Sequence, residues 1–503
     1  MRRTLARALF LLAIAPLAVG CKRHDALQAE RVARAYAPLA SAEAPPSESY
    51  QDHGVNPWVD TAKDNLSTFA VDVDTASYTI VRRKLDEGTL PPPAAVRVEE
   101  LVNYFKYAYP APDGDRPFSV SADLAPSPFQ PGRHVLRIGV ATRPVSIAER
   151  KPANLVFLVD VSGSMSSEDK LPLAKRALRI LVDNLKDGDT VSLVTYAGST
   201  RVVLPPTDLA HRAEILAAIE DLSSGGSTAM ASGLELAYQQ AARGLRPGAI
   251  SRVIVLSDGD ANVGTSSHEE ILASIAGHVK EGVTLSTIGF GMGNYKDALM
   301  EQLADKGNGN NYYIDRLDEA RRVFQEQLGA TLEVVAKDVK IQVELDPAKV
   351  GRYRLIGYEN RDIADADFRK DQVDAGEIGA GHQVTAVYEL ELTKAAPGAG
   401  AIGAVHIRHK TPRGETAAEA TYPVAMSSAS ARFDAASADL RFAFAVAAFA
   451  DVLRGGEDAA GWSLAEIREL AAGAAGDDDR RRELVALIDR AKSLEPAKAA
   501  LAR

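Results

Sequence analysis

The sequence predicts an α/β protein: a doubly wound, mostly parallel sheet, flanked by a small α+β region before it and a β-sandwich with helices after it. Three observations predict this. The 503 residues exceed the ~100–200 residues of one typical domain. From 154 to 332, apolar strand segments alternate with amphipathic helical segments, as in a parallel sheet covered by helices on both faces. After 332, short polar–apolar alternations between Gly, Pro and Asp turns indicate antiparallel strands.

Composition and charge limit the classes of function. Hydrophobic residues make up 46% of the chain and charged residues 25%, which is ordinary for a globular protein and too apolar for a mostly disordered one. The formal net charge is −10, so a general affinity for nucleic-acid phosphates would have to overcome repulsion, and we expect no nucleic-acid partner. The single cysteine excludes an intramolecular disulfide and a thiolate zinc cluster.

Residues 1–20 have the anatomy of a secretory signal peptide, with two arginines before an apolar run at 8–19 that is shorter than the ~20 residues of a membrane span. The segment LAVGC that follows resembles a bacterial lipobox, except that Ala18 stands where Leu is preferred. The resemblance implies that Cys21 is lipidated, and Lys22 favours outer-membrane sorting where a cell has two membranes. We therefore expect a lipid-anchored protein of the bacterial cell envelope, with ordinary signal-peptide cleavage as the alternative.

The region before the central domain has two expected parts. Residues 21–60 are rich in Ala, Pro, Ser and Glu, which indicates a flexible tether. Residues 61–150 are expected to form a small α+β domain. Its predicted elements are strand-like alternation at 66–80, a helix over 91–105, and strands at 118–123 and 135–140.

The central domain is expected over 151–332. Apolar runs predict strands at 155–161, 190–197, 252–259, 283–291 and 311–315. Apolar residues at helical spacing predict helices at 170–185, 211–222, 227–245, 269–279 and 296–307. Two prolines in 200–207 predict an edge strand there, because proline cannot donate a ladder hydrogen bond.

Residues 333–503 are expected to form a β-rich domain with C-terminal helices. Alternating residues predict the strands of an antiparallel sandwich at 337–346, 353–359, 383–392, 402–410 and 416–424. Helices are predicted at 434–454, 462–474 and 479–501. The apolar stripe AFAVAAF at 443–449 is predicted to be helix core, because its surroundings are too polar for a membrane span.

Oxygen-bearing side chains lie where predicted strands end or helices begin. DVSGSM places Asp160, Ser162 and Ser164 on alternate positions of the loop after the first central strand. GGSTAM places Thr228 at a helix start, and VLSDGD places Asp258 just beyond a buried strand. In open α/β sheets, ligands bind beyond the carboxyl ends of the strands. We expect these five side chains to converge there.

Carboxylates and hydroxyls form an all-oxygen ligand set, which suits hard divalent cations. We expect Mg²⁺, with Mn²⁺ or Ca²⁺ as alternatives. Because only two carboxylates offset its charge, such an ion would still attract an Asp or Glu carboxylate of a protein partner. The sequence has no GxSxG elbow and no evident histidine partner for Ser164, so we expect no catalytic residue and no small-molecule substrate.

DVSGSM, the Thr of GGST and the Asp of SDG resemble, in order and approximate spacing, the metal-ion-dependent adhesion site (MIDAS) of von Willebrand factor type A (VWA) domains. The resemblance implies five metal residues: Asp160, Ser162, Ser164, Thr228 and Asp258. Segments 56–85 and 353–390 resemble the domains that precede and follow a VWA domain in a group of bacterial lipoproteins. This likeness implies the same architecture and leaves the biological role open.

Other patterns have simpler interpretations. The serine-rich loop and Thr228 could merely cap helices. Asp72 and Asp74 echo the metal motif but are interpreted as solvent-facing strand carboxylates, with a second cation site as the alternative. The acidic residues between 362 and 377 lack EF-hand spacing and are interpreted as a solvated loop.

The leading hypothesis is a non-enzymatic, membrane-anchored protein that captures a partner's carboxylate through Mg²⁺. The first alternative is a metal-dependent enzyme such as a phosphatase, although the sequence offers no neighbouring acidic pair for a base or second metal. The second alternative is a structural envelope component whose metal site is vestigial.

Overall fold

The computed structural model describes residues 48–227, 230–259, 268–328, 332–394, 400–412, 414–425 and 429–495, apart from the side chains of 268–271, 274 and 276. The predicted signal peptide and Cys21 lie outside these residues. Among the helices that are described, none has both the length and the apolar character needed to cross a bilayer.

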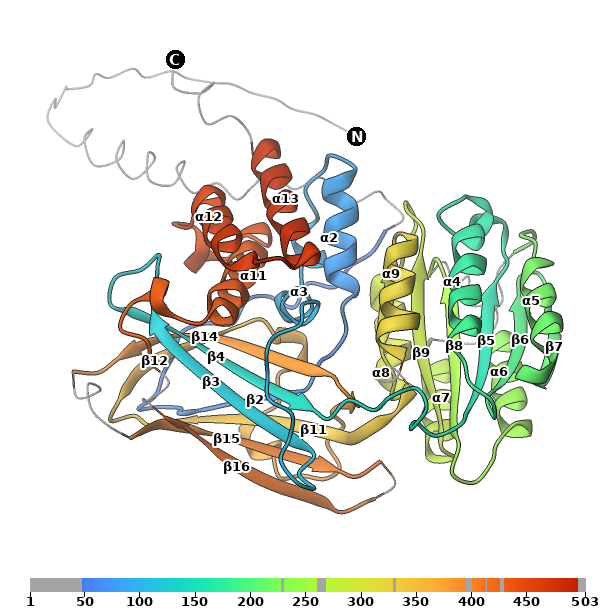
Figure 1. The fold of residues 1–503 in the computed structure, drawn as a ribbon, viewed down its shortest axis with the longest axis horizontal. Coiled ribbons are helices and arrows are strands. Elements are labelled where there is room, and N and C mark those ends of the chain that lie inside the picture. The colour runs from blue at the N-terminus through green and yellow to red at the C-terminus, as the bar shows by residue number, and fades with distance from the viewer. Residues whose placement is uncertain are drawn as a thin grey trace, which may run out of the picture. The chain divides into compact units, whose positions relative to one another are not determined.

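A six-stranded sheet forms the centre of residues 153–328 (Figure 1). Its strand order is β10-β9-β8-β5-β6-β7, and every neighbouring pair is parallel except β6 with β7. The strands are β5 (Ala153–Asp160), β6 (Thr190–Tyr196), β7 (Thr200–Asp208), β8 (Ile250–Ser257), β9 (Val283–Phe290) and β10 (Asn311–Ile314). The predicted fold class is confirmed, and the proline-containing strand β7 lies at the sheet edge.

Helices cover both faces of this sheet. Successive residues of a strand point to opposite faces, so neighbouring residues pack against different helices. Phe157 of β5 belongs to a core with α4 (Leu171–Asp183), α5 (Arg212–Glu220) and α9 (Leu317–Arg321). Leu158, the next residue, belongs to a core with α6 (Met230–Arg243), α7 (His268–Lys280) and α8 (Asp297–Lys306). All residues of β5 are buried, as expected for a central parallel strand.

Two antiparallel sheets form a sandwich from both ends of the chain. One contains, in order, β1 (Val59–Asp60), β12 (Val350–Ile356), β14 (Gln383–Leu392), β4 (Arg133–Thr142) and β3 (Phe118–Pro126). The other contains β13 (Gly376–Gly379), β11 (Val334–Leu345), β15 (Ala401–Lys410) and β16 (Ala417–Ala425), with β2 (Leu66–Ala70) paired to β11. Apolar residues from both sheets share one core.

The region 61–150 therefore does not form the separate α+β domain that we expected. Its strands β3 and β4 extend the sheet of β14, and its strand β2 pairs with β11. Polar–apolar alternation shows that a strand has one buried face, but it carries no information about which distant strand completes the ladder. The central sheet is thus an insertion between two chain segments that fold together.

A helical layer covers the sandwich on the side of β4 and β14. It contains α2 (Ala76–Asp86), α3 (Val98–Asn103), α11 (Ala438–Leu453), α12 (Leu464–Ala475) and α13 (Asp479–Leu494), which share a core with residues of both strands. The stripe at 443–449 is fully buried in α11, as predicted.

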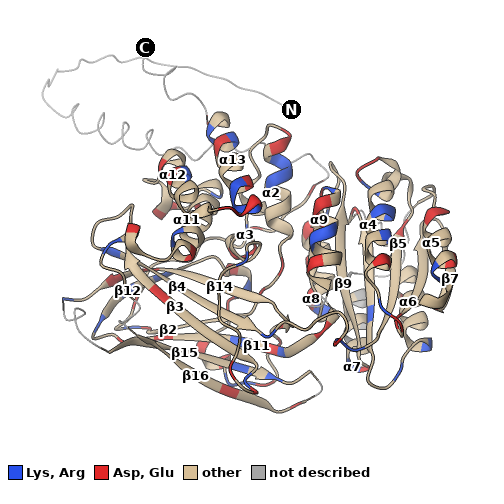
Figure 2. Cartoon of the chain, viewed as in Figure 1, with Lys and Arg blue, Asp and Glu red and all other residues tan. Residues whose placement is uncertain are grey.

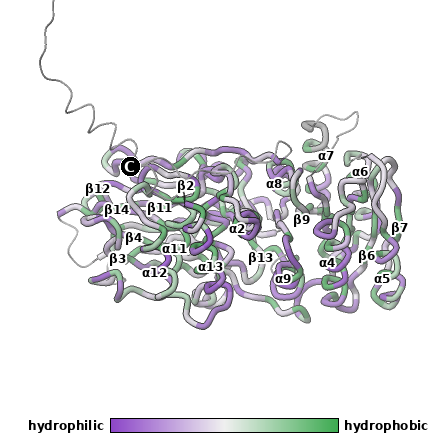
Figure 3. Tube along the Cα trace, turned by 90° about the horizontal axis from the view of Figure 1, so that it is seen from above, coloured by the Kyte–Doolittle hydropathy of each residue, from purple (hydrophilic) through white to green (hydrophobic). Residues whose placement is uncertain are grey.

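Ile80 was expected in a strand but lies in α2, whose C-terminal half is hydrophilic (Figure 3). The side chains of Arg82, Arg83 and Lys84 in this half form buried ion pairs.

The described part of the segment that we expected to be only a tether belongs to the fold. Glu48 is 7% exposed, and Val59 and Asp60 pair with β12. Composition alone missed this, because the polar residues of this segment are satisfied by partners far away in the sequence. The tether interpretation is therefore wrong for residues 48–60.

Candidate metal centre

Asp160 is the last residue of β5 and is completely buried. Its Oδ1 accepts a hydrogen bond from the backbone N–H of Ser162 at 2.9 Å, and its Oδ2 accepts one from the hydroxyl of Ser257 at 2.9 Å. Ser257 is the last residue of β8, which neighbours β5. Two adjacent parallel strands thus fix this carboxylate at the carboxyl edge of the sheet, the edge where ligands bind in such folds.

Ser162 and Ser164 bring two hydroxyls to the same place. Their Oγ atoms lie 3.0 Å apart, and Ser164 is also hydrogen-bonded to the carboxylate of Asp258. Ser162 is buried, whereas Ser164 is partly exposed. The structure therefore joins the Asp160 loop to the end of β8 through side-chain oxygens, as the sequence predicted.

A glycine-rich loop closes over the two serines. The N–H of Gly163 donates to the carbonyl oxygen of Gly226 at 3.0 Å. Gly226 has a φ of +89°, and a Cβ at this position would lie 3.1 Å from the backbone nitrogen of Gly198, so a glycine is needed there. Thr228 lies outside the described residues, and its role as a metal ligand stays a prediction.

Asp258 follows β8 and is held by two side chains that sequence reasoning missed. Its Oδ2 lies 2.9 Å from the Nζ of Lys170 and accepts a hydrogen bond from the Nδ2 of Asn294 at 3.0 Å. Lys170 also donates to the Oδ1 of Asn294 at 2.7 Å. Lys170 directly precedes α4, and Asn294 lies in the loop after β9, so the three residues come from three separate segments.

The loop after β9 is shaped to admit the lysine. Gly291 has a φ of +77°, and a Cβ there would lie 2.2 Å from the Cγ of Lys170. Only glycine lets the lysine chain pass so close to the backbone. A glycine directly after a buried strand was the one signal in the sequence for this close approach, and it does not reveal which side chain passes.

The two carboxylates have opposite pKa shifts. Burial raises the pKa of Asp160 to about 6, although hydrogen bonds from Ser162 oppose the rise, and the charge of Asp258 adds to it. Burial also acts on Asp258, but the hydrogen bond from Asn294 and the charge of Lys170 hold the pKa of Asp258 below its ordinary value. The charge of Lys170 thus offsets the negative charge of Asp258, whereas Asp160 has only hydrogen bonds from neutral groups. A cation bound beside Asp160 would therefore be favoured.

The donor set fits a hard divalent ion. Two carboxylates and two hydroxyls, from Asp160, Ser162, Ser164 and Asp258, supply only oxygen ligands at one edge of the sheet, as Mg²⁺ prefers. The part of the chain that the structure describes has no cluster of three or more His, Cys, Asp or Glu residues able to hold a metal. A divalent ion at this edge would therefore depend on the hydroxyls.

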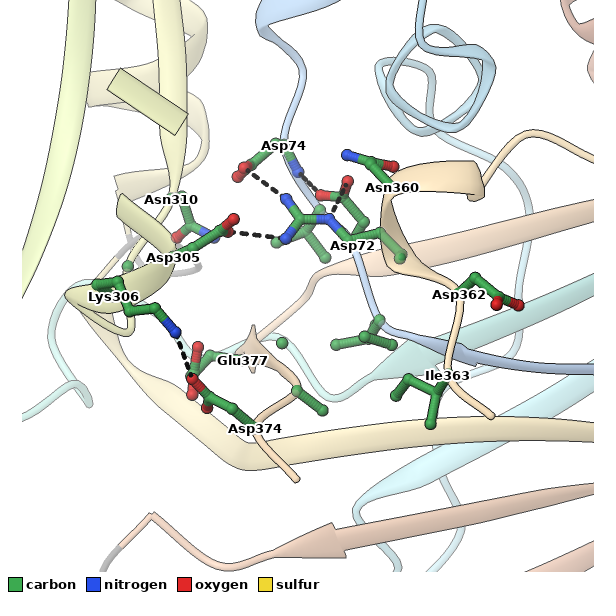
Figure 4. Close-up of a pocket in the computed structure, with 17 residues that line it drawn as sticks. Asp72, Asp74, Asp305, Lys306, Asn310, Asn360, Asp362, Ile363, Asp374 and Glu377 are labelled. Carbon is green, nitrogen blue, oxygen red and sulfur yellow. Dashed lines mark hydrogen bonds and ion pairs between the residues drawn. The ribbon is translucent and has the colours of Figure 1, made fainter. Parts of the chain in front are cut away.

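Asp72 and Asp74 are not the solvent-facing strand carboxylates that we expected. Both are buried, in the segment that follows β2. Arg361 lies 3.0 Å from the Oδ2 of Asp72, 3.5 Å from the Oδ2 of Asp74 and 2.7 Å from the Oδ1 of Asp305 (Figure 4). A guanidinium group that lies far away in the sequence thus pairs with these carboxylates, and its single positive charge offsets part of theirs.

The cavity beside Arg361 has a volume of about 220 Å³. Asp374 and Glu377 line it, and Lys306 lies 3.8 Å from Asp374 (Figure 4). Burial and the charge of Asp374 raise the pKa of Glu377 well above its ordinary value. The prediction of a solvated loop holds for the exposed Asp362 and is wrong for Glu377, which strand β13 turns toward the cavity.

The mostly parallel sheet with an Asp-Ser-Ser loop at its carboxyl edge defines a VWA domain. The family model of the von Willebrand factor type A domain matches residues 154–326. A model described as von Willebrand factor matches 44–137, and the model of the C-terminal part of the uncharacterized protein YfbK matches 330–494. VWA domains mediate protein–protein interactions and commonly hold a divalent metal at the MIDAS.

The uncharacterized protein YfbK of Escherichia coli is 41% identical to this chain over 471 residues, which cover 88% of this chain and 81% of that protein. The chain therefore belongs to the YfbK family, with an N-terminal von Willebrand factor region, a central VWA domain and a YfbK C-terminal domain.

Solved structures are more distant. A von Willebrand factor type A protein from Catenulispora acidiphila aligns with a TM-score of 0.43 and 19% identity, over 73% of this chain and 88% of that chain. Proximal thread matrix protein 1 from the mussel byssus, with zinc in its MIDAS motif, aligns with a TM-score of 0.31 and 23% identity, over 37% of this chain and 46% of that chain.

Proposed function

We propose that this protein is a non-enzymatic, lipid-anchored component of the bacterial cell envelope that binds a protein partner through a divalent cation. Five residues would hold the cation: Asp160, Ser162, Ser164, Thr228 and Asp258. The observation that carries the proposal is the convergence of four of them, joined by hydrogen bonds, at the carboxyl edge of the VWA sheet.

The charges at this edge support Mg²⁺ as the ion. Lys170 neutralises part of the charge of Asp258, so the donor set has little excess negative charge. A bound Mg²⁺ would supply a positive charge that attracts an Asp or Glu carboxylate of the partner. Mn²⁺ and Ca²⁺, which also prefer oxygen ligands, are the alternative ions.

The surroundings of the site suit a protein partner. Gly163, Gly198 and Gly225 are exposed around the serines, and Met292 on the next loop is 47% exposed. A carboxylate carried on a protein surface could therefore approach Ser164 without a deep cavity. The exposed methionine offers an adaptable apolar contact beside it.

The hydroxyl contacts support binding and not hydrolysis. Within the described residues, Ser162 and Ser164 contact each other and the two carboxylates, which is the arrangement of ligands and not that of a nucleophile beside a base.

We propose Cys21 as the lipidation site on sequence grounds alone. Labelling with radioactive palmitate, compared between wild type and Cys21→Ser, tests the anchor.

Isothermal titration of the purified protein with Mg²⁺ tests the metal site. Wild type is expected to bind one ion, and Asp160→Ala is expected to lose binding, because it removes a ligand and the acceptor for Ser162 and Ser257. Asp183→Ala, at the exposed end of α4, is the matched control and is expected to bind like wild type. Equal Mg²⁺ binding by wild type and Asp160→Ala would show that the site is misassigned.

A screen of phosphate esters with Mg²⁺ or Mn²⁺ tests the absence of enzymatic activity. We expect no turnover above that of the Asp160→Ala variant. Turnover by wild type that Ser162→Ala abolishes would overturn the assignment as a binding protein.

A further inference from the structure

The loop 291–296 connects the metal centre with the first described residues of the chain. On one side, Asn294 of this loop donates to Asp258 at 3.0 Å and accepts from Lys170 at 2.7 Å. The N–H of Met292 donates to the Oδ2 of Asp169 at 3.1 Å, next to Lys170. The loop thus carries one of the side chains that hold Asp258 in position.

On its other side, the loop contacts Glu48. The Oε1 of Glu48 accepts a hydrogen bond from the N–H of Gly293 at 2.9 Å, and the Glu48 side chain is completely buried. Arg83 lies 3.1 Å from Oε1 and Lys84 lies 2.9 Å from Oε2, both on α2. Tyr50 donates its hydroxyl to Oε2 at 3.0 Å.

Backbone contacts continue the attachment beyond Gly293. The N–H of Ser49 donates to the carbonyl oxygen of Tyr295 at 3.1 Å, and Ser49 forms a parallel bridge with Lys296. Arg83 also donates to the carbonyl oxygen of Gly291 at 2.9 Å. Residues 48–50 and α2 therefore fix the loop at both ends and in its middle.

Glu48 is held as a carboxylate. Burial alone would raise its pKa, but the charge of Arg83, the hydrogen bonds from Lys84 and Gly293, and the charge of Lys84 keep the pKa of Glu48 below its ordinary value. Glu87 also lies near Arg83 and Lys84, at 3.6 and 3.9 Å. Its side chain is 32% exposed, so it is a weaker partner for the same cations.

We propose that residues 48–50 are a latch that positions the loop 291–296 and, through Asn294, sets the affinity of the metal centre. Glu48 and Asn294 are positioning residues that act through Asp258. The inference rests on the proposed function for its metal readout, while the latch itself is a property of the metal-free protein. Any change that separates residues 48–50 from the loop 291–296 is expected to lower the metal affinity, although it alters no metal ligand.

Three variants test the latch. Glu48→Gln removes the charge that joins the loop to α2, Asn294→Ala removes the contact with Asp258, and Glu87→Gln is the matched control that faces the same two cations without touching the loop. Titration with Mg²⁺ is expected to show a loss of affinity on the order of tenfold for Glu48→Gln and for Asn294→Ala, and none for Glu87→Gln. The double variant is expected to lose little more than either single variant, because both act along one path.

Hydrogen exchange of the metal-free proteins provides the second measurement. The amides of 293–296 are expected to exchange faster in Glu48→Gln than in wild type or in Glu87→Gln. A chain that begins at Gln51 lacks the latch and serves as the second variant if Glu48→Gln does not fold. It is expected to show the same weaker Mg²⁺ binding and faster exchange.

The outcomes separate the two proposals. Unchanged exchange of 293–296 in both latch variants would overturn the latch, whatever the metal affinity. Faster exchange with wild-type Mg²⁺ affinity would overturn the positioning role. If wild type itself does not bind Mg²⁺, the proposed function fails and the positioning role with it, while the exchange comparison still decides whether the latch exists.

Discussion

Buried carboxylates in this protein differ in what compensates their charge. Asp258 has a lysine beside it, and Glu319 has Arg82 at 3.0 Å and Arg322 at 2.6 Å. Glu99 is different. It is 1% exposed and accepts a hydrogen bond from the N–H of Tyr358 at 2.8 Å. A buried carboxylate with such a neutral partner is expected to titrate at an unusual pH.

Replacement of Glu99 by glutamine is expected to stabilise the protein at alkaline pH. Burial, then the charges of Glu359 and Asp72, raise the pKa of Glu99 to about 7 from 4.5. The folded state therefore binds a proton that the unfolded chain loses, and the free energy of unfolding falls as the pH rises from about 4.5 through about 7. Glu99→Gln keeps the acceptor for Tyr358 and removes this loss, which is on the order of 3 kcal/mol.

Denaturant unfolding at pH 5 and pH 8.5 measures the effect. The difference in stability between Glu99→Gln and wild type is expected to be larger at pH 8.5 than at pH 5. Glu168→Gln, at an exposed position before α4, is expected to follow the pH profile of wild type. A Glu99→Gln profile parallel to that of wild type would show that Glu99 stays ionised in the folded protein.

Sequence reasoning identified the residues of the candidate metal centre that lie at strand ends, and it missed those that come from other segments. Asp160 and Asp258 end or follow buried strands, a position that local pattern predicts. Lys170 and Asn294 meet Asp258 only because the loop after β9 lies against the start of α4. That contact depends on the packing of two segments and leaves no periodic signal in either.

At the scale of elements, α11 is the centre of the helical layer. Its residues 442–450 are all fully buried, because α3, α12, α13 and the sheet of β14 surround it. Asp451 near its end pairs with Arg354 of β12 at 3.0 Å, which fixes the helix to the sheet. The helix begins after Ser437, whose hydroxyl accepts the N–H of Leu440 at 3.1 Å, as a typical N-cap.

Truncation of Phe444 in α11 is expected to destabilise the sandwich and its helical layer by about 3–5 kcal/mol, because it leaves a cavity in a closely packed core. The ring of Phe444 lies 5.6 Å from that of Trp462 and 5.5 Å from that of Phe129. Both tryptophans of the chain, Trp58 and Trp462, lie outside the VWA domain. Tryptophan fluorescence during denaturant unfolding of Phe444→Ala therefore reports on the affected part of the molecule.

The VWA domain, which contains the candidate metal centre, provides the internal control for this variant. Phe444→Ala is expected to leave Mg²⁺ affinity unchanged at denaturant concentrations where the fluorescence remains native. Arg441→Ala, on a less buried face of the same helix, is expected to change stability by less than about 1 kcal/mol. Equal losses in the two variants would mean that the ring of Phe444 contributes no specific packing.

The elements themselves were predicted well, and their pairing was not. The strands β5, β6, β8 and β9 begin and end within a few residues of the apolar runs that predicted them. Strands β3 and β4 were also predicted, but the pairing of β4 with β14 joins residues more than two hundred positions apart in the chain. Short helix α9 was missed, because its sequence LDEAR has too few apolar residues to show helical spacing.

At the scale of the whole molecule, the VWA domain interrupts a domain built from both ends of the chain. Arg97 before α3 pairs with Asp297 of α8, and Arg82 of α2 pairs with Asp315 after β10 at 2.6 Å. The C-terminal half of α2 and most of α9 carry charged residues (Figure 2). Apolar contacts add to these ion pairs, since Ile80 shares a small core with Tyr295 and Tyr313.

This topology predicts how fragments of the chain behave. The fragment 146–332 contains the sheet, both of its helical faces and the buried pair of Arg150 with Asp189, so it is expected to fold alone. Its melting temperature is expected to be lower than that of the full chain, because the contacts of Asp297 and Tyr313 with α2 and α3 are lost.

The fragment 48–150 is expected to stay unfolded alone, because its strand β4 loses β14 and its strand β2 loses β11, which leaves β3 and β4 as a hairpin. A two-stranded hairpin without these partners is at best marginally stable. Co-expression with 333–495 restores the ladders and is expected to give a folded complex that co-purifies. Circular dichroism melting curves of the fragment 146–332, the fragment 48–150 and the complex of 48–150 with 333–495 test these expectations. A cooperative transition in 48–150 by itself would show that this region is an independent domain.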